Sequence, residues 1–351
     1  MKKCTVLTFV FLFILSFKNN AQDLNEYGIS FGGNASWISV ESITYDKRIG
    51  FIVGVFGEWL LSIQAEEGYW NGGLYPAKKE KASVFNTGQI LFGINRLCQE
   101  TGDEKWAMSA QKGAKWLADN IGNDGLWDVG HYTGFNPTYY TRVAWPMLLV
   151  ADATGDDFIK NKAVQVLDKL IERKNHNGTF WGWGFKKDNP AFTHTIAYTM
   201  RGFMEASILL GDWERYGRKV EPALEKLFKL SELNKGRLAG DYDQDWNGTD
   251  YYSCLTGNLQ VALCLMRWYQ RKGDLQLLNA ASKLIEYVSG TQFTNAPIDA
   301  LNGAVAGSKP FWGRYMMGRY PNWAAKFHAD ALMLFLELSN QKEKEWSTAE
   351  L

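Results

Sequence analysis

The chain has few cysteines, few histidines and no net charge. Its 351 residues include four Cys, four His, 38 Lys or Arg and 38 Asp or Glu. Proteins that bind nucleic acid through its phosphates carry a basic excess, so the balanced charge argues against that partner. Zinc-ligand spacings, serine-nucleophile motifs, phosphate loops and dinucleotide-binding glycine patterns are also absent from the sequence. We therefore expect no cofactor.

Long apolar runs are confined to the N-terminus. Lys2 and Lys3 precede an apolar run over residues 5–17, and a polar stretch with Ala21 follows. This pattern predicts a secretory signal peptide over residues 1–22, so we expect an exported protein, periplasmic or secreted. The run is shorter than the roughly 20 residues that cross a bilayer, and no later segment is that long without charges, so no stable membrane insertion is expected. Cleavage removes three of the 38 basic groups and no acid, leaving 35 against 38.

The mature chain retains an odd number of cysteines, Cys98, Cys254 and Cys264. All three lie in apolar, helical contexts. We expect buried free thiols, with a single disulfide as the alternative.

A repeated Gly-Asp pair organises the chain. Glycine readily takes the left-handed conformation that ends a helix, and aspartate accepts the free amide hydrogens that begin the next one. The pairs recur at intervals of 53, 56 and 62 residues: Gly102-Asp103, Gly155-Asp156, Gly211-Asp212 and Gly273-Asp274. They predict repeated helical hairpins, each of which buries its apolar stripe against its neighbours.

Apolar periodicity predicts ten helices, at 48–66, 83–99, 103–121, 139–154, 157–174, 193–210, 213–232, 252–272, 274–291 and 321–340. The members that begin at 83, 139, 193, 252 and 321 are apolar nearly all round and should be inner. The others carry charged faces and should be outer. The prediction is an all-α, (α/α) toroid of about five to six hairpins, as a single domain over 48–341. An N-terminal extension at 23–47, with a weak strand signal, and a C-terminal tail at 342–351 would flank it, and we expect a monomer.

Long loops rich in glycine and aromatic residues lead into the inner helices, which gathers them on one rim. Aromatic rings on loops suit stacking against sugars. A large core is the simpler explanation of the 15 Trp, 16 Tyr and 20 Phe. We expect four loop tryptophans to bind substrate: Trp70, Trp127, Trp181 and Trp312.

Candidate catalytic residues lie at the starts of two inner helices. His194, Tyr198 and Arg201 are spaced to share one helix face, and Tyr140 and Arg142 begin the preceding inner helix. This set suits β-elimination from a uronic acid, in which a cation neutralises the carboxylate, a base removes the C5 proton and an acid protonates the leaving O4. Arg201 is assigned to substrate binding and the other four to catalysis. Helix capping and buried polar pairing are the structural alternative.

Further polar residues on the same rim are expected to contact substrate: Asn86, His131, Asn258 and Asn322. Amides between inner helices also serve as plain structural groups, so this signal is less specific.

An acidic cluster, Asp241, Asp243, Asp245 and Asp250, supports a second hypothesis. Two carboxylates facing a scissile bond are the machinery of a glycoside hydrolase. The spacing also faintly resembles a calcium loop, but no glycine follows the third aspartate directly and no glutamate closes the loop. A solvated loop is the structural alternative.

The starts of four inner helices resemble a known group of proteins. Tyr140-Thr141-Arg142-Val143-Ala144-Trp145, Thr193-His194-Thr195-Ile196-Ala197-Tyr198, Leu255-Thr256-Gly257-Asn258 and Pro321-Asn322-Trp323-Ala324-Ala325-Lys326-Phe327 resemble bacterial α/α-toroid proteins, prenyltransferase-like and of the VpsJ kind, found with polysaccharide genes. A looser similarity is to uronate polysaccharide lyases with incomplete toroids. That similarity implies roles for Arg142, His194, Tyr198 and Asn258, although the Asn-His motif of some lyases is absent.

The leading hypothesis is thus an exported enzyme that acts on a uronate-containing polysaccharide or oligosaccharide, most simply as a lyase. A hydrolase that uses the aspartates and a non-catalytic glycan-binding protein are the alternatives.

Overall fold

The computed structural model describes residues 57–73, 80–131, 134–188, 190–296 and 301–349. The predicted signal peptide and N-terminal extension lie outside the described residues, as do residues 48–56 of the first predicted helix; of its remaining residues, 57–62 are helical. No helix in the described ranges combines the length and apolar character needed to cross a membrane.

Besides the helical segment at 57–62, nine α-helices carry the fold over the described residues: α4 (Val84–Thr101), α5 (Glu104–Asp119), α6 (Thr141–Thr154), α7 (Asp157–Ile171), α8 (Thr193–Leu209), α9 (Gly217–Leu233), α10 (Leu255–Lys272), α11 (Leu275–Ser289) and α12 (Asn322–Ala349). A 3₁₀ helix, η3 (Thr138–Tyr140), leads into α6. The last helix is longer than predicted, because α12 continues through most of the segment that we expected to be a separate tail.

The Gly-Asp pairs act as predicted in three of four places. Gly102, Gly155 and Gly273 take left-handed conformations at the ends of α4, α6 and α10. The aspartate that follows each of them caps α5, α7 or α11. The fourth pair differs: after Gly211 the chain makes a turn over 213–216, and α9 begins four residues later than expected.

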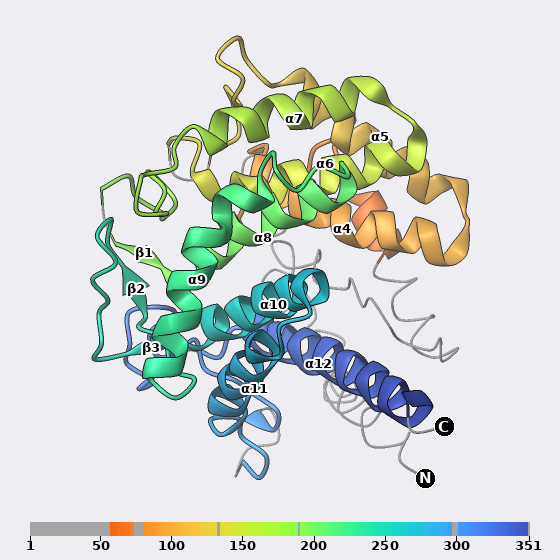
Figure 1. Cartoon of the computed structure of the whole chain (residues 1–351). Coiled ribbons are helices and arrows are strands. Elements are labelled where there is room, and N and C mark those ends of the chain that lie inside the picture. The colour runs from red at the N-terminus through yellow and green to blue at the C-terminus, as the bar shows by residue number, and fades with distance from the viewer. Residues whose placement is uncertain (1–56, 74–79, 132–133, 189, 297–300, 350–351) are drawn as a thin grey trace.

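The helices form an (α/α) toroid with two layers. Each of α4, α6, α8, α10 and α12 packs beside the next, and α5, α7, α9 and α11 lie outside them (Figure 1). Helices α4, α6, α8 and α10 are buried on nearly every face, as their composition predicts. Helix α12 differs from that prediction, because Leu332 and Leu336 on it are exposed. Because inner helices alternate with outer ones along the chain, all inner helices run in the same direction.

Two small sheets stand at the N-terminal ends of inner helices. β1 (Ala191–Phe192) pairs antiparallel with β2 (Asp241–Tyr242), and β3 (Ser253–Cys254) pairs antiparallel with β4 (Ser308–Lys309). Since α8 and α10 follow β1 and β3 directly, the sheets hold the long loops together on the predicted rim. We call this end of the toroid the loop rim.

Glycines let the inner helices approach closely near the loop rim. A Cβ atom on Gly202 of α8 would lie 2.4 Å from Thr141 Oγ1 of α6, and one on Gly257 of α10 would lie 2.7 Å from the backbone nitrogen of His194. Gly88 of α4 meets Val143 of α6 in the same way. Gly88 and Gly257 lie near the starts of their helices, whereas Gly202 lies midway along α8, where it meets the first residue of α6.

We expect Gly257→Ala to destabilise the fold by about 1–3 kcal/mol, because the methyl group must displace the backbone of α8. Urea unfolding followed by circular dichroism measures this change. Gly290→Ala is the matched control: Gly290 is exposed, has φ −67°, and its Cβ would come no closer than 3.5 Å to other atoms. Equal stability of the two variants would contradict the close-packing argument.

Candidate active site

The axis of the toroid is closed near the loop rim by aromatic side chains. Phe85 of α4 lies 5.7 Å from Tyr139 and 6.1 Å from Tyr198 between ring centroids. Phe192 lies 5.3 Å from Tyr315, which is 5.1 Å from His194. This layer separates the loop rim from the interior.

The predicted catalytic residues of α6 and α8 do come together. The centroids of His194 and Tyr198 are 4.3 Å apart, and the Arg142 guanidinium carbon lies 4.7 Å from the centre of the Tyr198 ring. Arg142 Nε donates to Gln89 Oε1 over 3.2 Å. Tyr140 is fully buried beside Phe85, one ring further from this group.

Burial governs the charges of this group. Burial, opposed by the Gln260 hydrogen bond, lowers the pKa of His194 to about 3, and it raises the pKa of Tyr198. His194 Nδ1 lies 3.0 Å from Gln260 Oε1. With this lowered pKa, His194 is neutral at physiological pH.

Below this layer lies a cavity of about 270 Å³, lined by all five inner helices. Its deep end is formed by buried Arg142, Phe92 and Phe327, and its exposed lining includes Gln99, Ile208 and Glu337. The lining residues come from the later parts of α4, α8 and α10, so the cavity opens toward the rim of short Gly-Asp turns. The sequence had placed the site at the loop rim.

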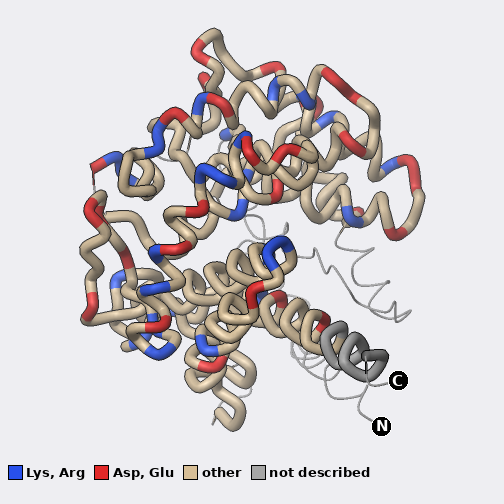
Figure 2. The backbone as a smooth tube through the Cα atoms, in the orientation of Figure 1, with Lys and Arg blue, Asp and Glu red and all other residues tan. Residues whose placement is uncertain are grey.

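Basic side chains outnumber acidic ones in this lining. In Figure 2 both signs are interspersed along the outer helices, whereas the cavity gathers five basic groups and three acidic ones. They are Arg96, Arg142, Arg201, Arg267 and Lys326 against Glu205, Asp330 and Glu337.

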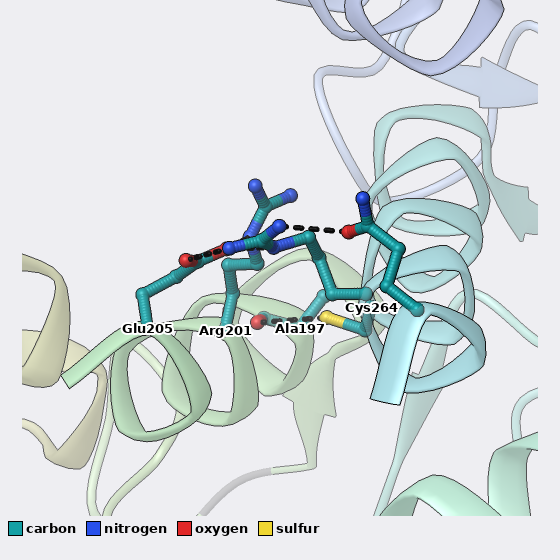
Figure 3. Close-up of polar contacts among 6 residues, drawn as sticks. Ala197, Arg201, Glu205 and Cys264 are labelled. Carbon is teal, nitrogen blue, oxygen red and sulfur yellow. Dashed lines mark hydrogen bonds and ion pairs between the residues drawn. The ribbon is translucent and has the colours of Figure 1, made fainter. Parts of the chain in front are cut away.

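Glu205 holds two of these cations. Arg201 Nε lies 2.6 Å from Glu205 Oε1, and Arg267 contacts both carboxylate oxygens at 2.8 Å. Figure 3 shows Arg201 and Glu205 on α8 facing α10, where Cys264 Sγ is 3.8 Å from the carbonyl oxygen of Ala197. Burial alone raises the pKa of Glu205, but the two guanidiniums outweigh burial and lower it. Glu205 therefore stays ionised.

The remaining cations crowd one another. Lys326 is ion-paired with Asp330 on the next turn of α12. Burial lowers the pKa of Lys326, and the positive charges of Arg142 and Arg201 lower it further. Burial and the charge of Arg201 lower the pKa of Arg142 as well. A bound anion would relieve this repulsion, so the cavity is suited to an anionic ligand.

Two of the four predicted sugar-binding tryptophans belong to the core. Trp70 and Trp127 are each 1% exposed, and their indole N–H groups donate to the carbonyl oxygens of Leu60 and Leu117. That assignment was wrong, because each ring fills the space beneath its loop. Trp181 and Trp312 are 41% and 69% exposed and remain available to a ligand.

The predicted amides and His131 lie apart from the cavity. The Asn258 side chain bonds the backbone of Leu238 and Cys254 and the hydroxyl of Ser253, and the Asn86 amide donates to the carbonyl of Asn71. Through these hydrogen bonds, the side chains of both residues hold loops in place.

His131 and Asn322 both stand on the loop rim. His131 lies 6.5 Å from Tyr140 between ring centroids, and burial lowers its pKa. Asn322 is the first residue of α12.

The four aspartates of the predicted acidic cluster lie in different environments. Only Asp241 is buried, where it accepts from Tyr252 and pairs with Arg314. Asp243 accepts hydrogen bonds from Asp245 and Asn247 within its own turn, and Asp250 is exposed. In the part of the chain that the structure describes, no three His, Cys, Asp or Glu side chains are grouped to hold a metal ion.

The cysteines are free, as expected, and Cys98 is only partly buried. Burial raises the pKa of both Cys254 and Cys264 to about 12, so their thiols stay protonated and carry no nucleophilic role.

The residues of the cavity that sequence reasoning missed are Glu205, Arg267, Lys326 and Asp330. Arg201-Glu205 and Lys326-Asp330 are four apart on inner helices that are otherwise apolar. A charged pair at helical spacing on such a helix is the signal that could have identified them.

No family model and no curated protein sequence matches the chain. Solved structures do match. The unsaturated glucuronyl hydrolase of Bacillus sp. GL1 aligns over 87% of this chain and 84% of its own at 13% identity, with a TM-score of 0.65. Cellobiose 2-epimerase of Bacillus thermoamylovorans aligns over 86% of both chains at 10% identity, with a TM-score of 0.68. A glycosyl hydrolase family 88 protein of Bacteroides vulgatus covers 94% and 98% at 11% identity, with a TM-score of 0.65.

At these identities the comparisons establish the fold, which confirms the predicted toroid. None of the three is a polysaccharide lyase or a VpsJ-type protein. The comparisons therefore support the toroid part of the sequence resemblance and not those two names.

We expect Glu205→Gln to destabilise the protein by about 3–5 kcal/mol at pH 7, because it leaves two guanidiniums without their buried partner. A carboxylate with a lowered folded pKa contributes its stability above the unfolded value, about 4.3, and loses it as the pH falls through the folded pKa. The difference from the unmodified protein should thus shrink below about pH 4.

Urea unfolding at several pH values measures this difference. The control Glu225→Gln removes an exposed pair with Lys229 and should cost less than about 1 kcal/mol at every pH. A pH-independent loss for Glu205→Gln would contradict the assignment.

Proposed function

We propose that this protein is a carbohydrate-active enzyme that takes an acidic, uronate-containing sugar into the axial cavity and hydrolyses it. The cationic lining of the cavity carries the proposal. Arg142, Arg201 and Lys326 crowd one another at its deep end, where a carboxylate would find complementary charge. The cavity volume of about 270 Å³ lies just below the usual range for ligand sites, roughly 300–1,000 Å³, which favours one or two sugar units.

Hydrolysis has more support than elimination. Two of the three structural neighbours described above carry hydrolase names, and one of those acts on a glucuronyl group by its name. The chain also offers a partly buried pair that can exchange a proton, the Lys326 ammonium and the Asp330 carboxylate.

Asp330 would accept a proton during the reaction, and Lys326 would donate one. Asp330 would take a proton from water as the water oxygen bonds to the anomeric carbon. Lys326, made more acidic by burial and by its cationic neighbours, would protonate the departing glycosidic oxygen as that bond breaks. Proton transfer from Asp330 back to Lys326 would then restore both groups. In this proposal the general base is Asp330 and not one of the aspartates of the 241–250 cluster.

β-Elimination remains the second candidate, because His194, Tyr198 and Arg142 do meet as it requires. Against it, a histidine whose pKa is about 3 is a weak base, and Tyr198 is nearly enclosed behind the aromatic layer. Retention of an acidic glycan without turnover is the remaining alternative. Export stays a prediction, since it depends on residues 1–22.

A panel of uronate oligosaccharides distinguishes the reactions. Hydrolysis releases reducing ends without the ultraviolet absorbance of an unsaturated uronate. In that case Tyr198→Phe and His194→Gln should change kcat by less than about threefold, since neither side chain touches the reacting atoms. Elimination would instead generate that absorbance, and the same variants would reduce kcat by about 10²–10⁴-fold. Binding without either product would favour the glycan-binding alternative.

Lys326→Arg tests the proton donor. Arginine keeps the positive charge and can pair with Asp330, but it does not release a proton. We expect kcat to fall by about 10²–10⁴-fold while KM changes little. Lys283→Arg alters an exposed pair with Glu232 and serves as the control. An unchanged kcat in Lys326→Arg would remove this residue from the mechanism.

A further inference from the structure

The segment that leads into α12 has an unusual charge. Between Asp299 and Asp330 the sequence contains no acidic residue and four cations, Lys309, Arg314, Arg319 and Lys326. Lys326 faces the cavity. The other three are exposed on the loop over 309–320.

The same loop exposes apolar side chains that a monomer usually buries. Phe311, Trp312 and Met317 are all exposed, and Trp312 is the most exposed tryptophan among the described residues. Phe311 stacks on Tyr320 at 4.9 Å with an angle of 28° between the rings, and Phe293 meets the other side of this pair at 5.7 Å from Tyr320. Exposed apolar groups gathered in this way mark a binding surface.

The loop is held in place by its own backbone. Gly313 N donates to Pro310 O, Gly318 N donates to Phe311 O, and Gly307 N donates to Arg319 O, at 2.8–3.0 Å. Gly313 is buried against Tyr252, where a Cβ would lie 2.7 Å from the ring. Arg314 Nη1 is 3.3 Å from the buried Asp241 carboxylate, which fixes the loop to β2. The aromatic rings are thus carried on an ordered support, which lowers the entropic cost of binding.

The loop lies at the opposite end of the toroid from the cavity opening. It precedes Asn322, the first residue of α12, whereas Glu337 lies at the exposed end of the cavity lining. At 1.5 Å per residue, the 15 residues between them span about 22 Å. The loop is therefore a surface of its own.

We infer that Phe311, Trp312, Arg314, Arg319 and Tyr320 form an acidic-polysaccharide-binding platform separate from the cavity. Flat aromatic faces stack against sugar rings, and guanidiniums on the same surface pair with the carboxylate or sulfate groups of the chain. Within the segment itself no acidic residue balances the cations, and the one acidic partner that the structure gives them, Asp241 beside Arg314, is buried, which favours a polyanion over a neutral glycan or a basic protein partner. This inference shares with the proposed function only the acidic nature of the sugar.

Affinity electrophoresis in gels containing polygalacturonate or its carboxyl-reduced form tests the platform. Trp312→Ala and Arg319→Gln should each weaken retention by the acidic polymer about tenfold, and added salt should weaken the unmodified protein in the same way. Both side chains are exposed, so the variants should fold, which circular dichroism verifies. Leu233→Ala and Lys226→Gln alter an equally exposed apolar group and cation on α9 and should retain full binding.

Equal retention by the carboxyl-reduced polymer would overturn the acidic specificity, and full retention of Trp312→Ala would overturn the platform itself. A separate measurement tests the proposed function of the cavity. Arg201→Gln, a cavity variant, should lose turnover of short acidic oligosaccharides yet keep polymer binding, whereas the platform variants should do the reverse. If Arg201→Gln keeps full turnover, the cavity assignment fails while the platform result stands.

Discussion

The close approach of the inner helices at three glycines is the constraint on which the interior depends. Gly88 and Gly257 bring the beginnings of neighbouring inner helices into contact near the loop rim, and Gly202, midway along α8, receives the start of α6. With the backbones so close, the side chains that point to the axis at this level fill it, and they are aromatic. The cavity described above lies further along the axis, where the inner helices carry long charged side chains. The close packing near the loop rim therefore limits this cavity on that side.

The charges in the cavity cost stability and are explained better by ligand binding. Removing a guanidinium or an ammonium from water is expensive, and a buried ion pair seldom recovers more than that cost. Here two guanidiniums share one carboxylate, and Lys326 and Arg142 add positive charge beside them. An apolar core would be more stable. Groups kept charged at such a cost are typical of a site whose ligand completes their coordination.

The sequence predicted the toroid because its signals are local. A Gly-Asp pair that ends one helix and caps the next needs no tertiary information, and neither does the contrast between helices that are apolar all round and those that are not. The direction of a loop side chain is different. Trp70 and Trp127 stand beside glycines in loops, as Trp181 does, but two of these rings turn into the core and one turns outward. The residues next to these tryptophans in the sequence do not distinguish the buried rings from the exposed one.

The candidate site was half predicted for a similar reason. Arg142 and Arg201, which line the cavity, were found because polar residues on an apolar helix are conspicuous. Glu205 and the Lys326-Asp330 pair were not, because pairs spaced four apart are commonest on solvated faces. Only the packing of α8, α10 and α12 around one axis shows that these pairs point inward together.

Two binding regions at opposite ends of the toroid would have separate functions, attachment to the polymer at the platform and turnover in the cavity. A polymer lying across the platform cannot run directly into a cavity that opens about 22 Å away along α12 on the other rim. The platform would therefore hold the enzyme on the polysaccharide without feeding that same stretch of chain to the cavity. Attachment raises the local concentration of neighbouring chain ends and released fragments, as for any tethered pair of sites. The advantage should appear on insoluble or dense polymer and vanish on short oligosaccharides, since only the former can occupy both ends at once.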